Sequence, residues 1–140
     1  MTSANPDDIL STDKHYLYSD SYRWRGTFMS EAGTTYRRPF KGLAIEAAEV
    51  RAWTRLRTDH PDAPAVAHEL FIAILASGAD TIEVTLSTAG TRLRITATGP
   101  APLPLRHSHG PGWRIIAELS RQTGVTTDEC GLWAQMEADR

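Results

Sequence analysis

The chain has 140 residues, 41% of them hydrophobic, and a formal net charge of -2 at pH 7. Its length fits one domain, and the apolar fraction is sufficient for a buried core, so global disorder is excluded. A charge this close to neutral argues against a direct nucleic-acid partner and against an anionic membrane surface.

The compartment is indicated by the cysteine content and by the absence of targeting patterns. Cys130 is the only cysteine, so no internal disulfide forms, and we expect it to be a packing residue rather than a nucleophile. Residues 1–16 show no basic start followed by an apolar core. The longest apolar run, 70–76, is far below the ~20 residues that span a membrane. We therefore expect a cytoplasmic protein with no membrane segment.

Residues 1–35 form a polar N-terminal extension with an aromatic pattern. The large aromatic residues fall on even positions: Tyr16, Tyr18, Tyr22, Trp24 and Phe28. A period of two is typical of strands, so 15–28 is predicted to be an added edge strand or hairpin. The alternative is a partly disordered tail that orders only on a partner. Acidic residues close by, such as Asp20, argue against binding of single-stranded nucleic acid here.

The main domain is expected to cover 36–140. A short strand is predicted at 34–40, across the start of this domain. Pro39 in that strand favours an edge position or a strand end. Residues 43–57 have helical periodicity. Their apolar positions form one stripe: Ile45, Ala48, Ala52 and Leu56.

A second helix is predicted from about residue 63 to 77. Asp62 is in position to cap its N-terminus, Pro64 lies in its first turn, and Gly78 is a natural C-terminal cap. Two alternating segments follow, 80–88 and 91–99, with a hairpin turn at Ala89-Gly90. We expect one face of this antiparallel pair to be buried and the other to be solvated.

The C-terminal part is predicted to contain a loop, a helix and a final hairpin. The loop at 99–112 is rich in proline, the helix spans 113–124 and is closed by Gly124, and the hairpin at 125–138 has Gly131 near its turn. The element order predicts an α+β, two-layer sandwich. In it, helices cover one face of a mixed, mostly antiparallel sheet.

This order of motifs resembles a known ATP-binding family. Glu69-Leu70, Ala73 and Ser77-Gly78 stand where that family has a helix with Glu-Leu, Asn and His-Gly. Its strand-end Asp-x-Gly and helix-opening Gly-x-Gly correspond to two triplets here, Ala97-Thr98-Gly99 and Gly110-Pro111-Gly112. Residues 131–138 match its closing strand. About three-quarters of the chain thus resembles the GHKL (Bergerat) fold of histidine kinases, and most of all anti-sigma-factor serine kinases of the RsbW type.

The departures from the family pattern concern its contacts with nucleotide. The family's asparagine binds Mg²⁺, which requires oxygen ligands, and Ala73 has none. The family's aspartate accepts a hydrogen bond from adenine, and Ala97 cannot, at a cost of about 1–3 kcal/mol for a buried amino group. Pro111 removes a backbone donor from the phosphate-binding loop. We expect no cofactor, unless other residues compensate and restore binding of ATP and magnesium.

Glu69 is the one functional residue of the family pattern that remains. In the family it acts as a general base or orienting group, and it has that catalytic role here only if the protein is active. The alternative interpretation is a first-turn acid that favours the N-terminus of its helix.

His107 and His109 in the proline-rich loop raise the question of a metal site. Two histidines are too few for a structural zinc site, and Cys130 is an uncertain third ligand, so no metal is expected. In the family this segment is the lid over ATP.

The resemblance implies a non-catalytic, pseudokinase-like regulatory domain. Its expected partner is a sigma factor, an anti-anti-sigma factor or a DNA-binding regulator, and a homodimer is also considered. The alternative is an active ATP-dependent serine/threonine kinase that phosphorylates an antagonist protein. A third hypothesis is a small-molecule site made more apolar by Ala73 and Ala97, against which stands simple filling of the pocket by side chains.

Overall fold

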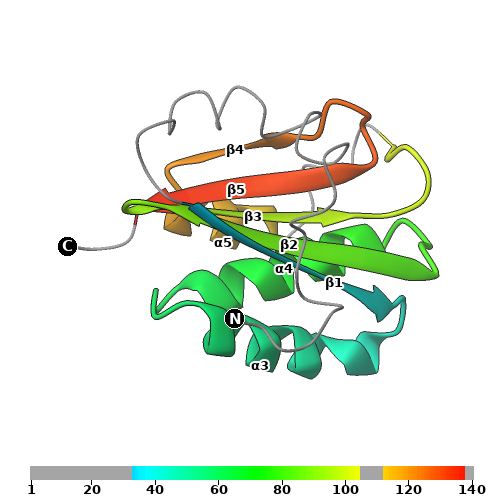
Figure 1. The fold of residues 1–140 in the computed structure, drawn as a ribbon. Coiled ribbons are helices and arrows are strands. Elements are labelled where there is room, and N and C mark those ends of the chain that lie inside the picture. The colour runs from blue at the N-terminus through cyan, green and yellow to red at the C-terminus, as the bar shows by residue number, and fades with distance from the viewer. Residues whose placement is uncertain (1–32, 105–111, 138–140) are drawn as a thin grey trace.

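The computed structural model describes residues 33–104 and 112–137. In Figure 1 these residues form one twisted sheet with the helices on one face. The elements in chain order are β1 (Gly33–Lys41), the 3-10 turn η3 (Ala44–Glu46), α3 (Ala47–Arg57), α4 (Ala63–Leu75), β2 (Thr81–Ala89), β3 (Arg92–Thr98), α5 (Trp113–Leu119), β4 (Gln122–Val125) and β5 (Gly131–Glu137). The predicted α+β two-layer architecture is therefore confirmed. Within the described ranges no helix has both the length and the apolar character needed to cross a bilayer.

The sheet has the strand order β1-β2-β3-β5-β4, and all four pairings are antiparallel. β1 is an edge strand, as Pro39 predicts, because proline cannot donate to a ladder on both sides. The hairpin between β2 and β3 turns at Gly90, whose φ of 60° lies in the left-handed region that glycine adopts without strain.

The core lies between this sheet and the helices. The strand residues predicted to share one face are fully or almost fully buried: Ile82, Val84, Leu86, Leu93, Ile95 and Ala97. α4 supplies the opposite side of the core through Leu70, Phe71 and Ile74. The Phe71 ring packs edge-to-face against Phe40 of β1, with the centroids 6.2 Å apart, and so ties the central helix to the edge of the sheet.

α3 packs on the core through a different set of residues from the apolar stripe predicted over 43–57. We call that stripe, Ile45, Ala48, Ala52 and Leu56, the α3 stripe. Its buried side chains are Ala47, Val50, Trp53 and Thr54, whereas Ile45 is 81% exposed and Leu56 is 78% exposed. The buried residues and the α3 stripe both have helical spacing. Burial of Trp53 with Val50 removes more apolar area from water than burial of the α3 stripe would. The α3 stripe is therefore real, but it faces outward.

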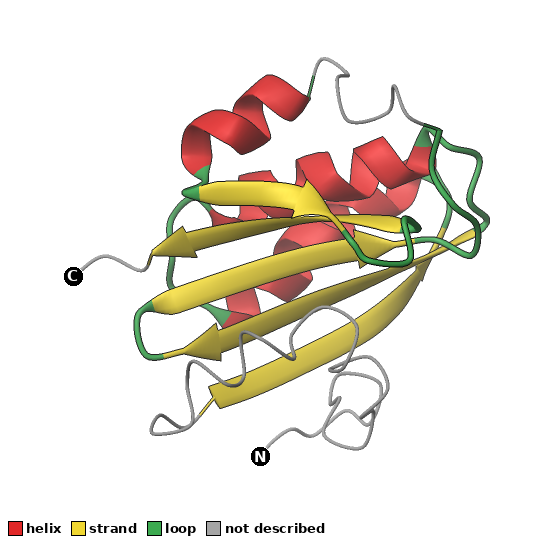
Figure 2. Cartoon of the chain, turned by 90° about the horizontal axis from the view of Figure 1, so that it is seen from above, coloured by secondary structure: helices red, strands yellow, loops and turns green. Residues whose placement is uncertain are grey.

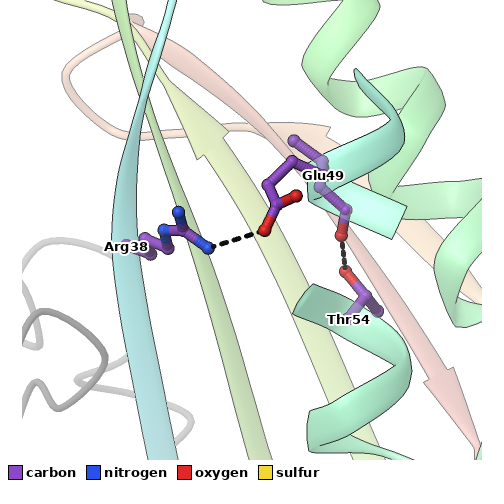
Figure 3. Close-up of polar contacts among 4 residues, drawn as sticks. Arg38, Glu49 and Thr54 are labelled. Carbon is purple, nitrogen blue, oxygen red and sulfur yellow. Dashed lines mark hydrogen bonds and ion pairs between the residues drawn. The ribbon is translucent and has the colours of Figure 1, made fainter. Parts of the chain in front are cut away.

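Figure 3 shows two polar contacts of α3, one to β1 and one within the helix itself. Arg38 of β1 donates to Glu49 of α3, with 3.4 Å between Nη1 and Oε2. This pair is largely exposed and is expected to contribute at most about 1 kcal/mol. Thr54 is fully buried, and its hydroxyl donates to the carbonyl oxygen of Val50 at 2.8 Å, which satisfies the only polar group of its side chain.

The boundaries of α4 agree with the sequence signals, although one cap works differently. Asp62 occupies the N-cap position and proline lies in the first turn, but the Asp62 side chain makes no capping bond. Its backbone N–H instead donates to His60 Nδ1 at 3.1 Å. After the helix ends at Leu75, Gly78 adopts a φ of +89°, consistent with its predicted role in ending the helix.

The prediction of a helix from 113 to 124 is wrong in its second half. α5 ends at Leu119, and Gly124 lies within β4, opposite Trp133 of β5. A Cβ at position 124 would lie 2.7 Å from Cζ2 of the Trp133 ring. The glycine therefore serves close packing against an indole rather than a helix terminus.

The prediction that the outer face of the sheet is solvated is also wrong at its centre. We use "outer face" for the face opposite the helices. Thr85 and Thr96 point to this face and are each 2% exposed, and the neighbouring Ser87 is 5% exposed. The middle of this face is thus excluded from water.

Glu83, also on the outer face, gives a testable pH dependence. Burial raises the pKa of Glu83, and Arg37, whose Nε lies 3.1 Å from Oε2, offsets part of that rise. The folded state therefore holds the Glu83 proton more tightly than the unfolded state. Wild-type stability attributable to this group should fall as pH rises from the ordinary glutamate value through the raised one.

We expect Glu83→Gln to gain stability relative to the wild type as pH rises from about 4, the ordinary glutamate pKa, through the raised pKa of Glu83. Urea denaturation of both proteins at several pH values measures the difference. At pH values below the ordinary glutamate pKa, protonated Glu83 and the glutamine that replaces it are both neutral and similar in shape. The stability difference at low pH therefore serves as the internal control. A difference that stays constant or shrinks as pH rises would contradict the expectation.

Candidate functional site

Three elements meet where the sequence places the nucleotide-like motifs: the middle of α4, the C-terminal end of β3 and the start of α5. Glu69 lies on α4, and its side chain is 19% exposed. Gly112 is the N-cap residue of α5. A Cβ on Gly112 would overlap Oε1 of Glu69, so the carboxylate lies directly against the start of α5. The structure thus brings together the acid and the glycine that the motifs place far apart in sequence.

The interpretation of Glu69 as a first-turn acid is wrong. α4 begins at Ala63, so Glu69 lies in the middle of this helix, away from the first turn. A stabilising interaction with the N-terminus of its own helix does not apply, because that effect falls off within one turn.

Two residues that the sequence analysis did not select, Arg51 and His68, complete a polar cluster with Glu69. Nη1 of Arg51 on α3 lies 2.6 Å from Nδ1 of His68 on α4. Arginine can only donate, so Nδ1 is the acceptor and the ring proton resides on Nε2. That nitrogen is 3.8 Å from Oε2 of Glu69, an ion-pair distance only when the ring is protonated, and too long for a hydrogen bond.

The cluster could be found only in part from the sequence. The adjacent His68 and Glu69 before an apolar run are visible as a polar pair on an otherwise apolar helix. Arg51 belongs to another helix, and its approach follows from how α3 packs on α4. The Glu69 carboxylate oxygens can accept a hydrogen bond from a hydroxyl placed beside them.

The positions of Ala97 and Gly99 are filled by protein. Ala97 is fully buried, and its neighbours across the sheet, Val84 and Leu132, are fully buried as well. A Cβ at Gly99 would lie 3.2 Å from Cγ2 of Ile74 and 3.1 Å from Cβ of Ala79. The described side chains therefore close the space beside the end of β3, where the family pattern has its adenine-binding carboxylate.

Ala73 and Gly99 offer no side-chain group for a ligand. Ala73 is half-buried and packs against the core, on the α4 turn that follows Glu69. The Gly99 backbone N–H already donates to the carbonyl oxygen of Cys130 at 2.9 Å.

The remaining predicted positions lie outside the described residues. Gly110 and Pro111 of the glycine loop and both loop histidines, His107 and His109, fall between 105 and 111. Among the residues that the structure does describe, no three His, Cys, Asp or Glu side chains are grouped so that they could hold a metal ion.

Cys130 has the environment of an unreactive thiol. Burial raises the pKa of the Cys130 thiol, and the negative charges of Asp128 and Glu129 raise it further. Only the thiolate is an effective nucleophile, so a raised pKa lowers the reactive fraction at neutral pH. Cys130 is half-exposed just before β5 and does not belong to the hydrophobic core of the described residues.

Comparison with known proteins gave no relative from which a function could be transferred. No protein-family model matches the chain, and no curated protein matches it.

Proposed function

We propose that the chain is a cytoplasmic, non-catalytic regulatory domain with a GHKL-like fold, which binds a protein regulator of transcription through the α3 stripe. The resemblance to anti-sigma-factor kinases suggests the partner class: a sigma factor, an anti-anti-sigma factor or a DNA-binding regulator. The observation that carries the proposal is the outward-facing α3 stripe, whose ends, Ile45 and Leu56, are both almost fully exposed.

The α3 stripe has the character of a protein-binding surface. A helix packed on a core normally has one apolar side, because the other side faces water. α3 has two, and Leu43 just before it is also half-exposed. Large apolar side chains that gather on one exposed side mark interaction sites more often than isolated ones do. Ala48 and Ala52 lie between the large ends and would let a partner helix approach closely.

The filled nucleotide-like position supports a role without catalysis. Ala97 is in the dry core, and the side chains of Ile74 and Ala79 crowd Gly99. Phosphoryl transfer depends on positioning the phosphates and their metal, so an acid such as Glu69 without them has no substrate to act on. A domain that keeps the scaffold but lacks these contacts can still present a surface to a partner.

One observation favours the alternative, an active serine/threonine kinase. Glu69 lies against Gly112 at the start of α5, with His68 beside it, so an acid and a potential proton carrier adjoin the glycine motif. An active enzyme would need substitute contacts for adenine and magnesium.

Calorimetric titration with Mg-ATP separates the two functions. We expect no saturable heat with the full-length chain at millimolar nucleotide. A micromolar binding isotherm would contradict the expected loss of the nucleotide site. Transfer of labelled phosphate to a partner, lost in Glu69→Ala, would contradict the non-catalytic proposal and establish the kinase.

The partner surface is tested by charge substitution on the α3 stripe. Ile45→Asp with Leu56→Asp should abolish co-purification of the regulator that the wild-type chain binds in its native host, identified by mass spectrometry. Ala101→Asp, in the exposed loop after β3, adds the same charge elsewhere and should leave binding intact. If both variants retain the regulator, the α3 stripe is not the binding surface.

A further inference from the structure

The outer face of the sheet has small hydroxyl residues at its centre, with larger side chains on both sides of them. Thr85 lies opposite Thr96, and Ser87 is next along β2. We call these three residues the outer trough. On one side of it are Arg37 and Glu83, joined by their ion pair. On the other side, the Arg94 guanidinium stacks on the Trp133 ring, 4.1 Å from the centroid.

The outer trough is buried although all the described helices lie on the other face of the sheet. In Figure 2 the strands are in front and the helices are behind them. Thr85 and Thr96 are nonetheless almost completely shielded from water, and the Nε atom of Arg94 is buried as well. A guanidinium nitrogen is seldom withdrawn from water on an open surface. By contrast, the α3 stripe on the helix side is uncovered. The centre of the outer face is therefore shielded from water, whereas the ends of the α3 stripe are exposed.

We propose that residues 1–32 of the same chain fold back across the outer face of the sheet and seat aromatic side chains over the outer trough. This goes beyond the proposed function and does not depend on it.

The length and attachment point of the segment suit this path. The segment joins the sheet at Gly33, the first residue of edge strand β1, where β1 pairs with Ala89. Five strands spaced about 4.8 Å apart make a sheet only ~20 Å wide. A 32-residue segment can extend to about 100 Å, so it can cross the face and return.

The composition of the segment fits the surface that it would cover. Aromatic residues at alternate positions, such as Tyr22 and Trp24, lie on one side of an extended chain. Aromatic rings can pack on threonine methyl groups and stack on guanidinium groups such as Arg37 and Arg94. Residues 1–32 contain five acidic and three basic residues, a small negative balance that complements these arginines. The burial that raises the pKa of Glu83 is on the same face.

Thiol protection in the full-length chain tests the cover directly. In a Cys130→Ser background, Thr96→Cys places a thiol in the outer trough, and Thr91→Cys places one in the exposed β2–β3 turn as the matched control. Rates of alkylation by a small neutral reagent are normalised to those of the same variants in urea. We expect the Thr96→Cys thiol to react at least about tenfold more slowly than the Thr91→Cys thiol.

The same pair of thiols is then measured after the aromatic side chains of the segment are removed. The residues Tyr16, Tyr18, Tyr22, Trp24 and Phe28 are all replaced by serine, and circular dichroism checks that the fold persists. The proposal expects the Thr96→Cys rate to rise at least about tenfold while the Thr91→Cys rate is unchanged. Continued protection of the Thr96→Cys thiol would overturn the proposal, because the sheet's own side chains would then account for the burial.

A cross-linking measurement keeps the proposal falsifiable if the serine variant does not fold. A photoreactive phenylalanine at Trp24 is activated in a mixture of isotopically light and heavy full-length chains. Cross-links within one chain to peptides of β2, β3 or β5 support the proposal. Cross-links to α3, or between light and heavy chains, overturn it.

Discussion

Replacing Ala97 by aspartate is expected to lower the free energy of unfolding by about 3–5 kcal/mol, the range typical of an uncompensated buried charge. The substitution introduces the acid that the GHKL family has in its adenine-binding motif, but Ala97 is fully buried between Val84 and Leu132. A carboxylate at this position has neither water nor a described cationic partner beside it. Restoring the motif should therefore destabilise the protein rather than restore nucleotide binding.

Ala97→Asn is the matched control, because asparagine has the size and shape of aspartate without its charge. Chemical denaturation should show a smaller loss for Ala97→Asn, and the difference between the two variants should widen as pH rises and the aspartate ionises. If Ala97→Asp keeps wild-type stability and binds Mg-ATP in calorimetry, the space beside the end of β3 is open rather than filled by side chains.

Gly42→Ala is expected to lower the free energy of unfolding by about 3 kcal/mol, at the upper end of the usual cost of overpacking. Gly42 connects β1 to η3, and its N–H donates to the carbonyl oxygen of Asp80 at 2.9 Å. A Cβ at this position would overlap the carbonyl oxygen of Ala79 and lie 2.9 Å from Cα of Asp80. These are backbone atoms at the start of β2, so the clash can be relieved only by moving the two chain segments apart.

Gly112→Ala is the matched control for Gly42→Ala. Its added Cβ meets the flexible end of Glu69, which can rotate away, so we expect a loss of less than about 1 kcal/mol. Thermal or urea unfolding of both variants measures the comparison. Equal losses would mean that backbone crowding at Gly42 is not the cause. Because Gly112→Ala displaces Glu69, any effect on phosphoryl transfer without a loss of stability would favour the kinase alternative.

The sheet and its helices could be predicted because several local signals agree. Alternation in β2 and β3 identifies the core face, and Ala89-Gly90 identifies the turn between them. Pro39 correctly places β1 at an edge. Such consistency between local pattern and overall arrangement is what allows a single sequence to define its fold.

The predictions that failed depend on which of two equivalent patterns the tertiary packing selects. α3 has two apolar sides with the same periodicity, and spacing alone does not say that Val50 and Trp53 face the core. Gly124 has the sequence character of a helix terminator, yet it accommodates the Trp133 ring from a strand nine residues later.

The candidate site is even less accessible from sequence. Arg51 reaches His68 only because α3 packs on α4. The positions that resemble the family's motifs could be selected from the sequence, but their chemistry could not be deduced from their order alone. That nucleotide does not bind remains a prediction, and the titration with Mg-ATP tests it.

Pro39 also affects how copies of this protein can associate. The free side of an edge strand offers unpaired N–H and C=O groups, to which a strand from another molecule can add and so begin an extended aggregate. Within a paired strand, the proline nitrogen must face away from β2, so that free side lacks a donor at its exposed position 39. At the opposite edge, β4 has only four residues, too few to template a long pairing. Both edge strands of the described sheet, β1 and β4, therefore disfavour the addition of strands from other molecules. Copies of the protein would instead associate through side-chain surfaces.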